Sequence, residues 1–337
     1  MSNECIIGGR TNDRARGSLL KSGDILLLTE RNQGRISWTN AHAAKMVKYL
    51  QMVGNGPVDI CKMCLNVKQL QDSHLLPASV YKKLRRVHLS DADNPNPDPI
   101  AVTFRKARQT SKQTTDYLLC SDCEGILDRM GEKHVLPLLA TEVGFPLYDL
   151  LKRIPPEIEE PDLVIYSCAK MPSLDCEKLA HFATGIFWKT AIHAWRSGAS
   201  TVKIDLQGHE ENLREYLLGA KPFPDEVALI LRIAPPNLPL LSAVTPITVR
   251  NANFDMHWFY VPGITFSLHV GKQAALEFRE GCFVHNPGRP VFVDPTAALI
   301  LGKLYRESFM TAEKSTRLAA ALEKRRKRHI NSSDAPP

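Results

Sequence analysis

Two C-x-x-C pairs are the residues of this sequence with the clearest chemistry. They are CKMC, with Cys61 and Cys64, and CSDC, with Cys120 and Cys123. Thiolates are soft ligands, and two such pairs supply a closed tetrahedral zinc site. A redox dithiol needs only one pair, so structural zinc is favoured, while iron stays an alternative because thiolates also bind it. We predict that Cys61, Cys64, Cys120 and Cys123 bind one structural Zn²⁺.

Length and composition set the class of protein. The chain has 337 residues, with 44% hydrophobic and 23% charged residues and a net charge of +7. This balance is typical of a globular protein, and a mild positive charge fits a phosphate-binding surface. No apolar run reaches the length of about 18 to 20 residues that a membrane span needs, and no secretory signal is recognised. We therefore expect a cytoplasmic protein with no membrane partner, in which Cys5, Cys168, Cys176 and Cys282 are buried thiols.

The residues between and beside the two pairs carry a second pattern. After CKMC comes Ser73-His74-Leu75-Leu76-Pro77, and Glu124 follows CSDC directly. In this order the segment resembles the HNH endonucleases, a branch of the ββα-metal (His-Me finger) nucleases, over roughly residues 58–135. The resemblance implies a small, treble-clef-like ββα zinc module. Together with the strands and helices expected further along, it predicts an α+β fold with a larger mixed domain of mostly antiparallel strands.

The resemblance also implies catalytic roles. His74 would be the general base that takes a proton from water, and one Mg²⁺ or Mn²⁺ would stabilise the charge on the phosphate. Glu124 stands where the family has His or Asn, and Glu132 lies about two helical turns later. The chain departs from the family at Ser73, where an acid is usual, although Asp72 is one residue away. The supporting Asn of the family is also missing, and Asp116 stands nearest to its position.

Cations flank the proposed site. Phosphate contacts give affinity that weakens with salt but carry no sequence information. We expect double-stranded DNA as the partner, and a protein partner is an alternative for the C-terminal half. The predicted nucleic-acid-binding residues are Lys82, Lys83, Arg85, Arg86, Arg105 and Arg108.

Hydrophobic patterning and turn residues predict four parts of the chain. They are a flexible N-terminal tail (1–20), the zinc-knuckle domain with flanking helices (21–150), a mixed α+β domain (151–312) and a basic C-terminal helix and tail (313–337). Helices are expected at 39–53, from 124 onwards with a break at Gly131, and at 175–195, 211–219 and 295–329. Strands are expected at 23–30, 101–107, 163–169, 226–234, 257–263, 264–271 and 289–294.

Three functions are consistent with these observations. The first is an HNH-type, metal-dependent endonuclease that hydrolyses phosphodiester bonds in DNA, in antiviral (phage) defence or a mobile element. The second is a catalytically inactive, zinc-stabilised module that binds nucleic acid or protein, since the usual acid before His74 is replaced by Ser73. The third is a transcription regulator, although the sequence shows no clear recognition helix.

Overall fold

The computed structural model describes residues 5–8, 56–86, 99–103, 106–197, 200–235, 241–271 and 274–296, together with 299, 302, 303 and 306. The strand predicted at 23–30, the helix predicted at 39–53, the segment 313–337 and Arg105 lie outside the described residues. So does most of the helix predicted at 295–329, and the side chains of Arg86 and Arg108 are not described either.

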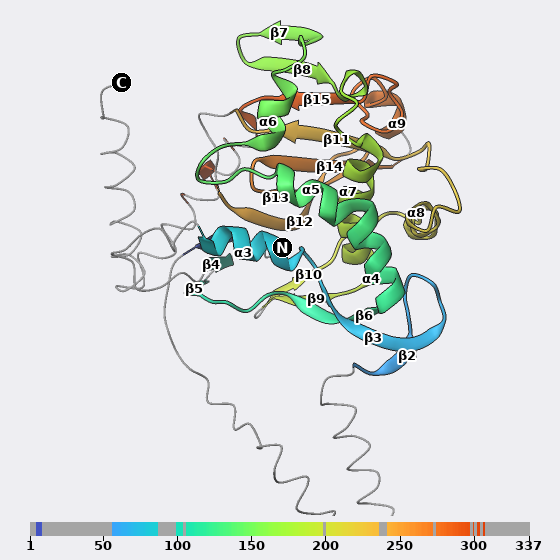
Figure 1. Ribbon diagram of the computed structural model, residues 1–337. Coiled ribbons are helices and arrows are strands. Elements are labelled where there is room, and N and C mark those ends of the chain that lie inside the picture. The colour runs from blue at the N-terminus through green and yellow to red at the C-terminus, as the bar shows by residue number, and fades with distance from the viewer. Residues whose placement is uncertain are drawn as a thin grey trace, which may run out of the picture.

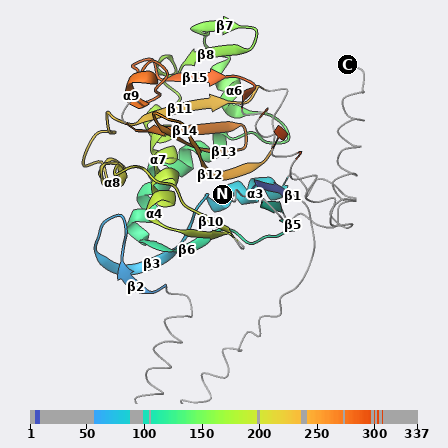
Figure 2. The same cartoon turned by 180° about the vertical axis from the view of Figure 1, so that it is seen from behind.

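A ten-stranded sheet forms the largest part of the described chain. Its strand order is β5-β4-β1-β12-β13-β14-β11-β15-β8-β7 (Figures 1 and 2). Every neighbouring pair is antiparallel except β11 and β15, as the sequence predicted. The strands are β1 (Cys5–Gly8), β4 (Pro99–Thr103), β5 (Lys106–Gln109), β7 (Ile158–Glu160), β8 (Leu163–Ser167), β11 (Ala228–Ile233), β12 (Ala243–Arg250), β13 (Asp255–Val261), β14 (Ile264–Val270) and β15 (Pro290–Val293).

The helix α7 (Cys176–Ile192) packs on one face of this sheet. Asp175 caps its first turn by accepting a hydrogen bond from the backbone N–H of Lys178. Phe182 and Phe187 of α7 pack against Phe259 of β13, with ring centroids 6.3 and 5.0 Å apart. The helix is buried along most of its length, because its residues are apolar on nearly every side.

The region of the two cysteine pairs is built on a smaller, three-stranded sheet of β2 (Val58–Ile60), β3 (Val67–His74) and β6 (Thr115–Cys120). The helix α4 (Ser121–Leu127) follows β6 at once and continues through a π-helical turn (Asp128–Glu132) into α5 (Lys133–Val135). The break predicted at Gly131 is instead a π-helical turn, through which the helix continues. A Cβ atom at Gly131 would lie 2.9 Å from Cα of Phe182, so only glycine lets α7 approach this closely.

The remaining elements connect these layers. They are α3 (Ala78–Arg86), α6 (Pro146–Leu151), α8 (Glu210–Leu217), α9 (Ala274–Glu277), the hairpin of β9 (Trp195–Ser197) with β10 (Ser200–Val202), and the 3-10 turns Leu136–Leu138 and Cys168–Lys170. Gly219 follows α8 with φ +72°, the C-cap conformation that the sequence predicted. No helix in the described part of the chain is long and apolar enough to cross a bilayer. Helices and strands together confirm the α+β class.

Several elements differ from the sequence-based predictions. The segment 5–8, predicted as part of a flexible tail, forms β1 between β4 and β12. The strand predicted at 101–107 is two strands, β4 and β5, and β7 was not predicted. The helix predicted at 175–195 ends at Ile192, and β12 was not predicted. Pairing with distant strands decides these cases, and a local pattern does not contain that information.

The knuckle region and the large sheet share one hydrophobic core. The buried apolar residues form a continuous cluster from Cys61 to Val293. In addition, β4 and β5 lie between the two cysteine pairs in sequence but join the large sheet through β1. The boundary predicted near residue 150 therefore marks a change in composition and does not separate two cores.

Candidate metal centre and the acid–base cluster beside it

The four predicted cysteines converge on one point. The sulfur atoms of Cys61, Cys64, Cys120 and Cys123 all lie within 4.8 Å of one another, and those of Cys64 and Cys120 are 3.9 Å apart. Tetrahedral coordination with Zn–S bonds of the usual length places sulfurs about 3.8 Å from each other. The cluster therefore has the ligand types and spacing of a closed metal site.

Two different local structures present the cysteines. In the first knuckle, the backbone N–H of Leu65 donates to the carbonyl of Cys61 at 2.9 Å, and Leu65 adopts a left-handed φ of +62° that reverses the chain. In the second, Cys120 precedes α4 and Cys123 lies in its first turn. The backbone N–H of Cys120 donates to the sulfur of Cys61 at 3.3 Å, which joins the knuckles directly.

The electrostatics of the cluster favour a bound cation. Burial opposes a thiolate at Cys64, but hydrogen bonds from the backbone of Asn66 and from the neighbouring thiols outweigh it and lower the pKa of Cys64 to about 7. Burial raises the pKa of Cys120 and of Cys123. A positive ion that binds all four sulfurs compensates the burial of their charge. Arg214 of α8 also stabilises the first knuckle, because its Nη1 donates a hydrogen bond to the carbonyl of Met63 at 2.6 Å.

His74 lies at the end of β3, where it pairs with Thr115 of β6. The residue before it, Ser73, is only 1% exposed. The hydroxyl of Ser73 donates a short hydrogen bond to the carboxylate of Glu124 and accepts one from the backbone N–H of Leu119 at 3.3 Å. Ser73 thus connects β3 to α4 through Glu124.

Glu132 and Lys189 complete this second cluster. Lys189 comes from α7 and is 2% exposed, and its ammonium group donates to the backbone carbonyl of His74 at 2.6 Å. Burial raises the pKa of Glu132, and the Glu124 charge raises it further, while Lys189 opposes both effects. Burial lowers the pKa of His74. The charges of Asp72 and Glu124 raise this pKa, and the charge of Lys189 lowers it further. We call His74, Glu124, Glu132 and Lys189, with Ser73, the His74 cluster.

The other predicted polar residues have different surroundings. Asp72 is exposed, and Asp116 shares a hydrogen bond of 2.9 Å with the ring of His193. His134 accepts a hydrogen bond from the backbone N–H of Asp175, so it supports the start of α7. Within the described ranges, the four cysteines are the one group of three or more His, Cys, Asp or Glu ligands close enough to share an ion. A divalent ion at the His74 cluster would be held by the carboxylates of Glu124 and Glu132, with water or phosphate as its other ligands.

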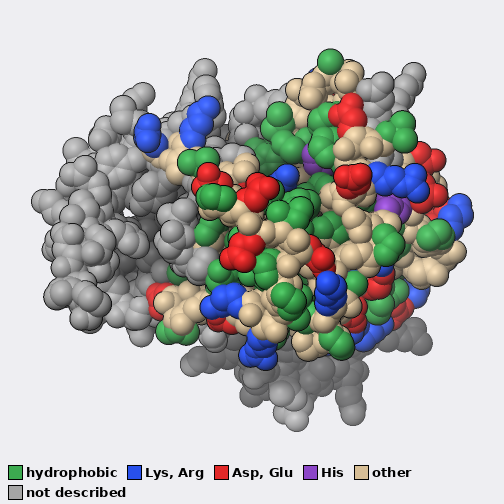
Figure 3. Space-filling view, turned by 90° about the horizontal axis from the view of Figure 1, so that it is seen from above, with side chains coloured by type: hydrophobic (Ala, Val, Ile, Leu, Met, Phe, Trp, Pro, Cys, Tyr) green, Lys and Arg blue, Asp and Glu red, His purple; other side chains and the backbone are tan. Residues whose placement is uncertain are grey.

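The predicted cations lie partly on α3. Lys82 and Arg85 are exposed and Lys83 is half-buried, while Val80 and Leu84 of the same helix pack into the core. Figure 3 shows another face of the molecule, where acidic and basic side chains are interspersed among the described residues. Among the described residues, the outer side of α3 is therefore the candidate surface for phosphate contacts.

Sequence reasoning missed Lys189 and the partner of His193. Leu179, Phe182 and Ile186 follow helical spacing, and Lys189 continues the same apolar face three residues later. A charge on that face is a usable signal, because a buried ammonium group needs a specific partner. The pairing of His193 with Asp116 joins residues 77 positions apart and has no local signal.

Comparison with known proteins gave no match: no family model fits the sequence, and no curated protein or solved structure is significantly similar to it.

Proposed function

We propose that this protein is an HNH-type, metal-dependent DNA endonuclease whose four cysteines bind structural zinc. The observation that carries the proposal is the hydrogen bond from Ser73 to Glu124. It holds the carboxylate of Glu124 in α4 against the residue that precedes His74 in β3, and the charge of Glu124 acts on the His74 ring. An acid–base pair on a ββα unit, next to a closed four-cysteine centre, is the arrangement that the sequence resemblance implies.

In this proposal, each residue has a defined task. A ring nitrogen of His74 takes a proton from a water molecule while the oxygen of that water bonds to phosphorus. The P–O bond to the leaving group breaks, and the leaving oxygen keeps its electron pair. Glu124 and Glu132 would hold Mg²⁺ or Mn²⁺, which stabilises negative charge on the phosphate when bound. Lys82 and Arg85 on α3 would contact the DNA backbone. The pKa of His74 is lowered by burial, which keeps the imidazole neutral and able to accept the proton.

The test is cleavage of supercoiled plasmid in Mg²⁺ or Mn²⁺ with the full chain. We expect nicking by the wild-type protein and a loss of at least about a hundredfold in His74→Ala and in Glu124→Gln, with zinc content unchanged. His209→Ala is the matched control, since His209 precedes α8 outside the cluster and makes no capping hydrogen bond with its side chain. Equal cleavage by His74→Ala and wild type would disprove the assignment.

A second candidate is a zinc-stabilised module that binds DNA or protein without cutting it. The buried ammonium group of Lys189 favours this reading, because it supplies positive charge to Glu132 from within the protein. The exposed apolar side chains of Val58 and Val67 on β2 and β3, which are 64% and 68% exposed, also suit a partner surface. Salt-sensitive DNA binding without cleavage in any divalent metal would support this candidate.

A further inference from the structure

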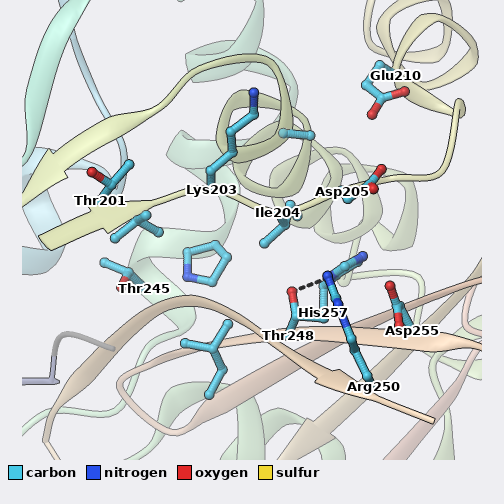
Figure 4. Close-up of a pocket in the computed structure, with 14 residues that line it drawn as sticks. Thr201, Lys203, Ile204, Asp205, Glu210, Thr245, Thr248, Arg250, Asp255 and His257 are labelled. Carbon is cyan, nitrogen blue, oxygen red and sulfur yellow. Dashed lines mark hydrogen bonds between the residues drawn. The ribbon is translucent and has the colours of Figure 1, made fainter. Parts of the chain in front are cut away.

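A polar cavity of about 510 Å³ lies apart from the His74 cluster, between residues 201–205 and the strands β12 and β13. This volume is in the range of small-molecule sites. Figure 4 shows Thr201, Lys203 and Asp205 on one side of it, with Thr248, Arg250 and His257 on the other. Neither the cysteines nor the members of the His74 cluster line this cavity.

A β-bulge in β12 shapes the cavity. Val244 pairs with Tyr260 and Ile247 pairs with Trp258, so Thr245 and Pro246 together face a single residue of β13. Pro246 fits such a position because it has no N–H to donate to the ladder. The bulge breaks the alternation of side chains, and the four consecutive residues from Thr245 to Thr248 all line the cavity. Bulges of this kind redirect side chains towards ligand sites.

The floor of the cavity contains a buried hydroxyl that lowers the stability of the protein when no ligand pairs with it. Thr245 is 0% exposed, and its hydroxyl has no hydrogen-bond partner among the described residues. A buried polar group left unpaired costs about 1–3 kcal/mol. Next to it, the hydroxyl of Thr248 and Nδ1 of His257 share a hydrogen bond of 2.8 Å, which fixes the orientation of the buried ring (Figure 4).

The walls and the rim have complementary chemistry. Val202 and Ile204 on one side of the cavity and Ile247 of β12 on the other are the apolar walls, suited to a flat or aliphatic part of a ligand. Arg250 is exposed at the rim, with no carboxylate at ion-pair distance in the described chain, and offers a fork of donors for an anion. Asp255, its neighbour in the β12–β13 pairing, offers acceptors for hydroxyl or amino groups.

We propose that this cavity binds a mononucleotide. Arg250 and Lys203 would contact its phosphate, Asp205 and Asp255 would accept hydrogen bonds from the ribose hydroxyls, and the base would lie along the apolar wall and reach the Thr245 hydroxyl. An anionic group, a vicinal diol and a flat apolar body occur together in this class of ligand. The site is independent of the proposed nuclease activity, since none of the residues assigned to catalysis line it.

The test is isothermal titration of the full-length, zinc-loaded protein with AMP, GMP, CMP and UMP, and with inorganic phosphate and ribose as fragments. We expect at least one mononucleotide to bind with a Kd below about 1 mM, and each fragment to bind more weakly. His74→Ala should bind the same nucleotide equally well, which separates this cavity from a product bound at the nuclease site. Absence of binding by all four mononucleotides would overturn the proposal.

Two variants locate the ligand. Arg250→Ala should weaken binding by about tenfold or more, the effect of losing a charged hydrogen bond. Thr245→Val, which has the same shape without the hydroxyl, should weaken binding while leaving the ligand-free protein at least as stable to urea. Arg153→Ala, an exposed cation after α6, is the control and should bind normally. Unchanged binding in either variant would overturn the placement of the ligand in this cavity. A Thr245→Val protein that is destabilised without ligand would show that the hydroxyl has a structural role and is not held free for a ligand.

Discussion

The cysteine cluster and the His74 cluster both include a residue of α4, Cys123 and Glu124, but are held together in different ways. The cysteine cluster takes all of its ligands from two short turns and can be closed by a single ion. The His74 cluster depends on α7, because Lys189 bonds to a residue 115 positions earlier in the chain. The first site is therefore a local structure that an ion completes, whereas the second exists only when the sheet half of the protein has packed against it.

The largest expected effect comes from breaking the local site. Cys120→Ser should release the metal and unfold the region near residues 58–135, because the free energy of structural zinc binding, about 10–16 kcal/mol in small zinc domains, is also folding free energy. Metal analysis and hydrogen exchange would measure both changes. Cys176→Ser is the control, since Cys176 lies at the start of α7 and outside the cluster. Full metal content in Cys120→Ser would contradict a four-cysteine site.

The next effect tests the dependence of the His74 cluster on α7. Lys189→Met keeps the length of the side chain but removes the donor to the His74 carbonyl, so we expect a loss of about 1–3 kcal/mol in the free energy of unfolding. The pKa of Glu132 should rise further, since Lys189 lowers it. Urea unfolding and carboxyl NMR titration measure these changes, and the metal content should stay at the wild-type value. A Glu132 that titrates as in wild type would show that Lys189 does not act on it.

A smaller effect is expected at Ser73, which connects β3 to α4 within the His74 cluster. Ser73→Ala removes the hydroxyl that bonds to Glu124 and Leu119, and should cost about 1–2 kcal/mol of stability. Ser73→Asp restores the acid of the HNH pattern but places a second carboxylate against Glu124, so it should be less stable than Ser73→Ala at neutral pH. Urea unfolding of the two variants decides the order. A Ser73→Asp protein as stable as wild type would show that the serine is not required to hold Glu124.

The smallest effect is the pH dependence of the His74 cluster. The folded pKa of His74 is lowered, so its contribution to stability is complete above the unfolded value of about 6.5 and is lost as the pH falls through the folded value. The folded pKa of Glu132 is raised, so its contribution is complete below about 4.3 and is lost as the pH rises through the folded value. Hydrogen exchange in β3 between pH 4 and 8 should show both trends. In His74→Gln, the loss of protection as the pH falls below about 6.5 should be smaller.

The two clusters also differ in how far the sequence predicted them. The cysteine pairs and their convergence follow from residue type and spacing, and the structure brings the four sulfurs together. His74, Glu124 and Glu132 came from the order of residues around the pairs, and in the structure the charges of Glu124 and Lys189 act on both His74 and Glu132. Their catalytic roles stay predictions. Lys189 was not predicted, because a helical pattern shows that a face is buried and does not show which distant atoms it meets.

The sequence alone determined the features that depend on near neighbours. These are the two knuckles, the apolar helix α7 and the strands β8, β11, β13, β14 and β15 of the large sheet. Only the tertiary structure decided that β1, β4 and β5 join that sheet, that Lys189 reaches His74, and that a bulge in β12 opens a cavity beside His257. The physical reason is that propensity and spacing act over a few residues, while strand pairing and burial of charge depend on which distant surfaces meet when the core closes.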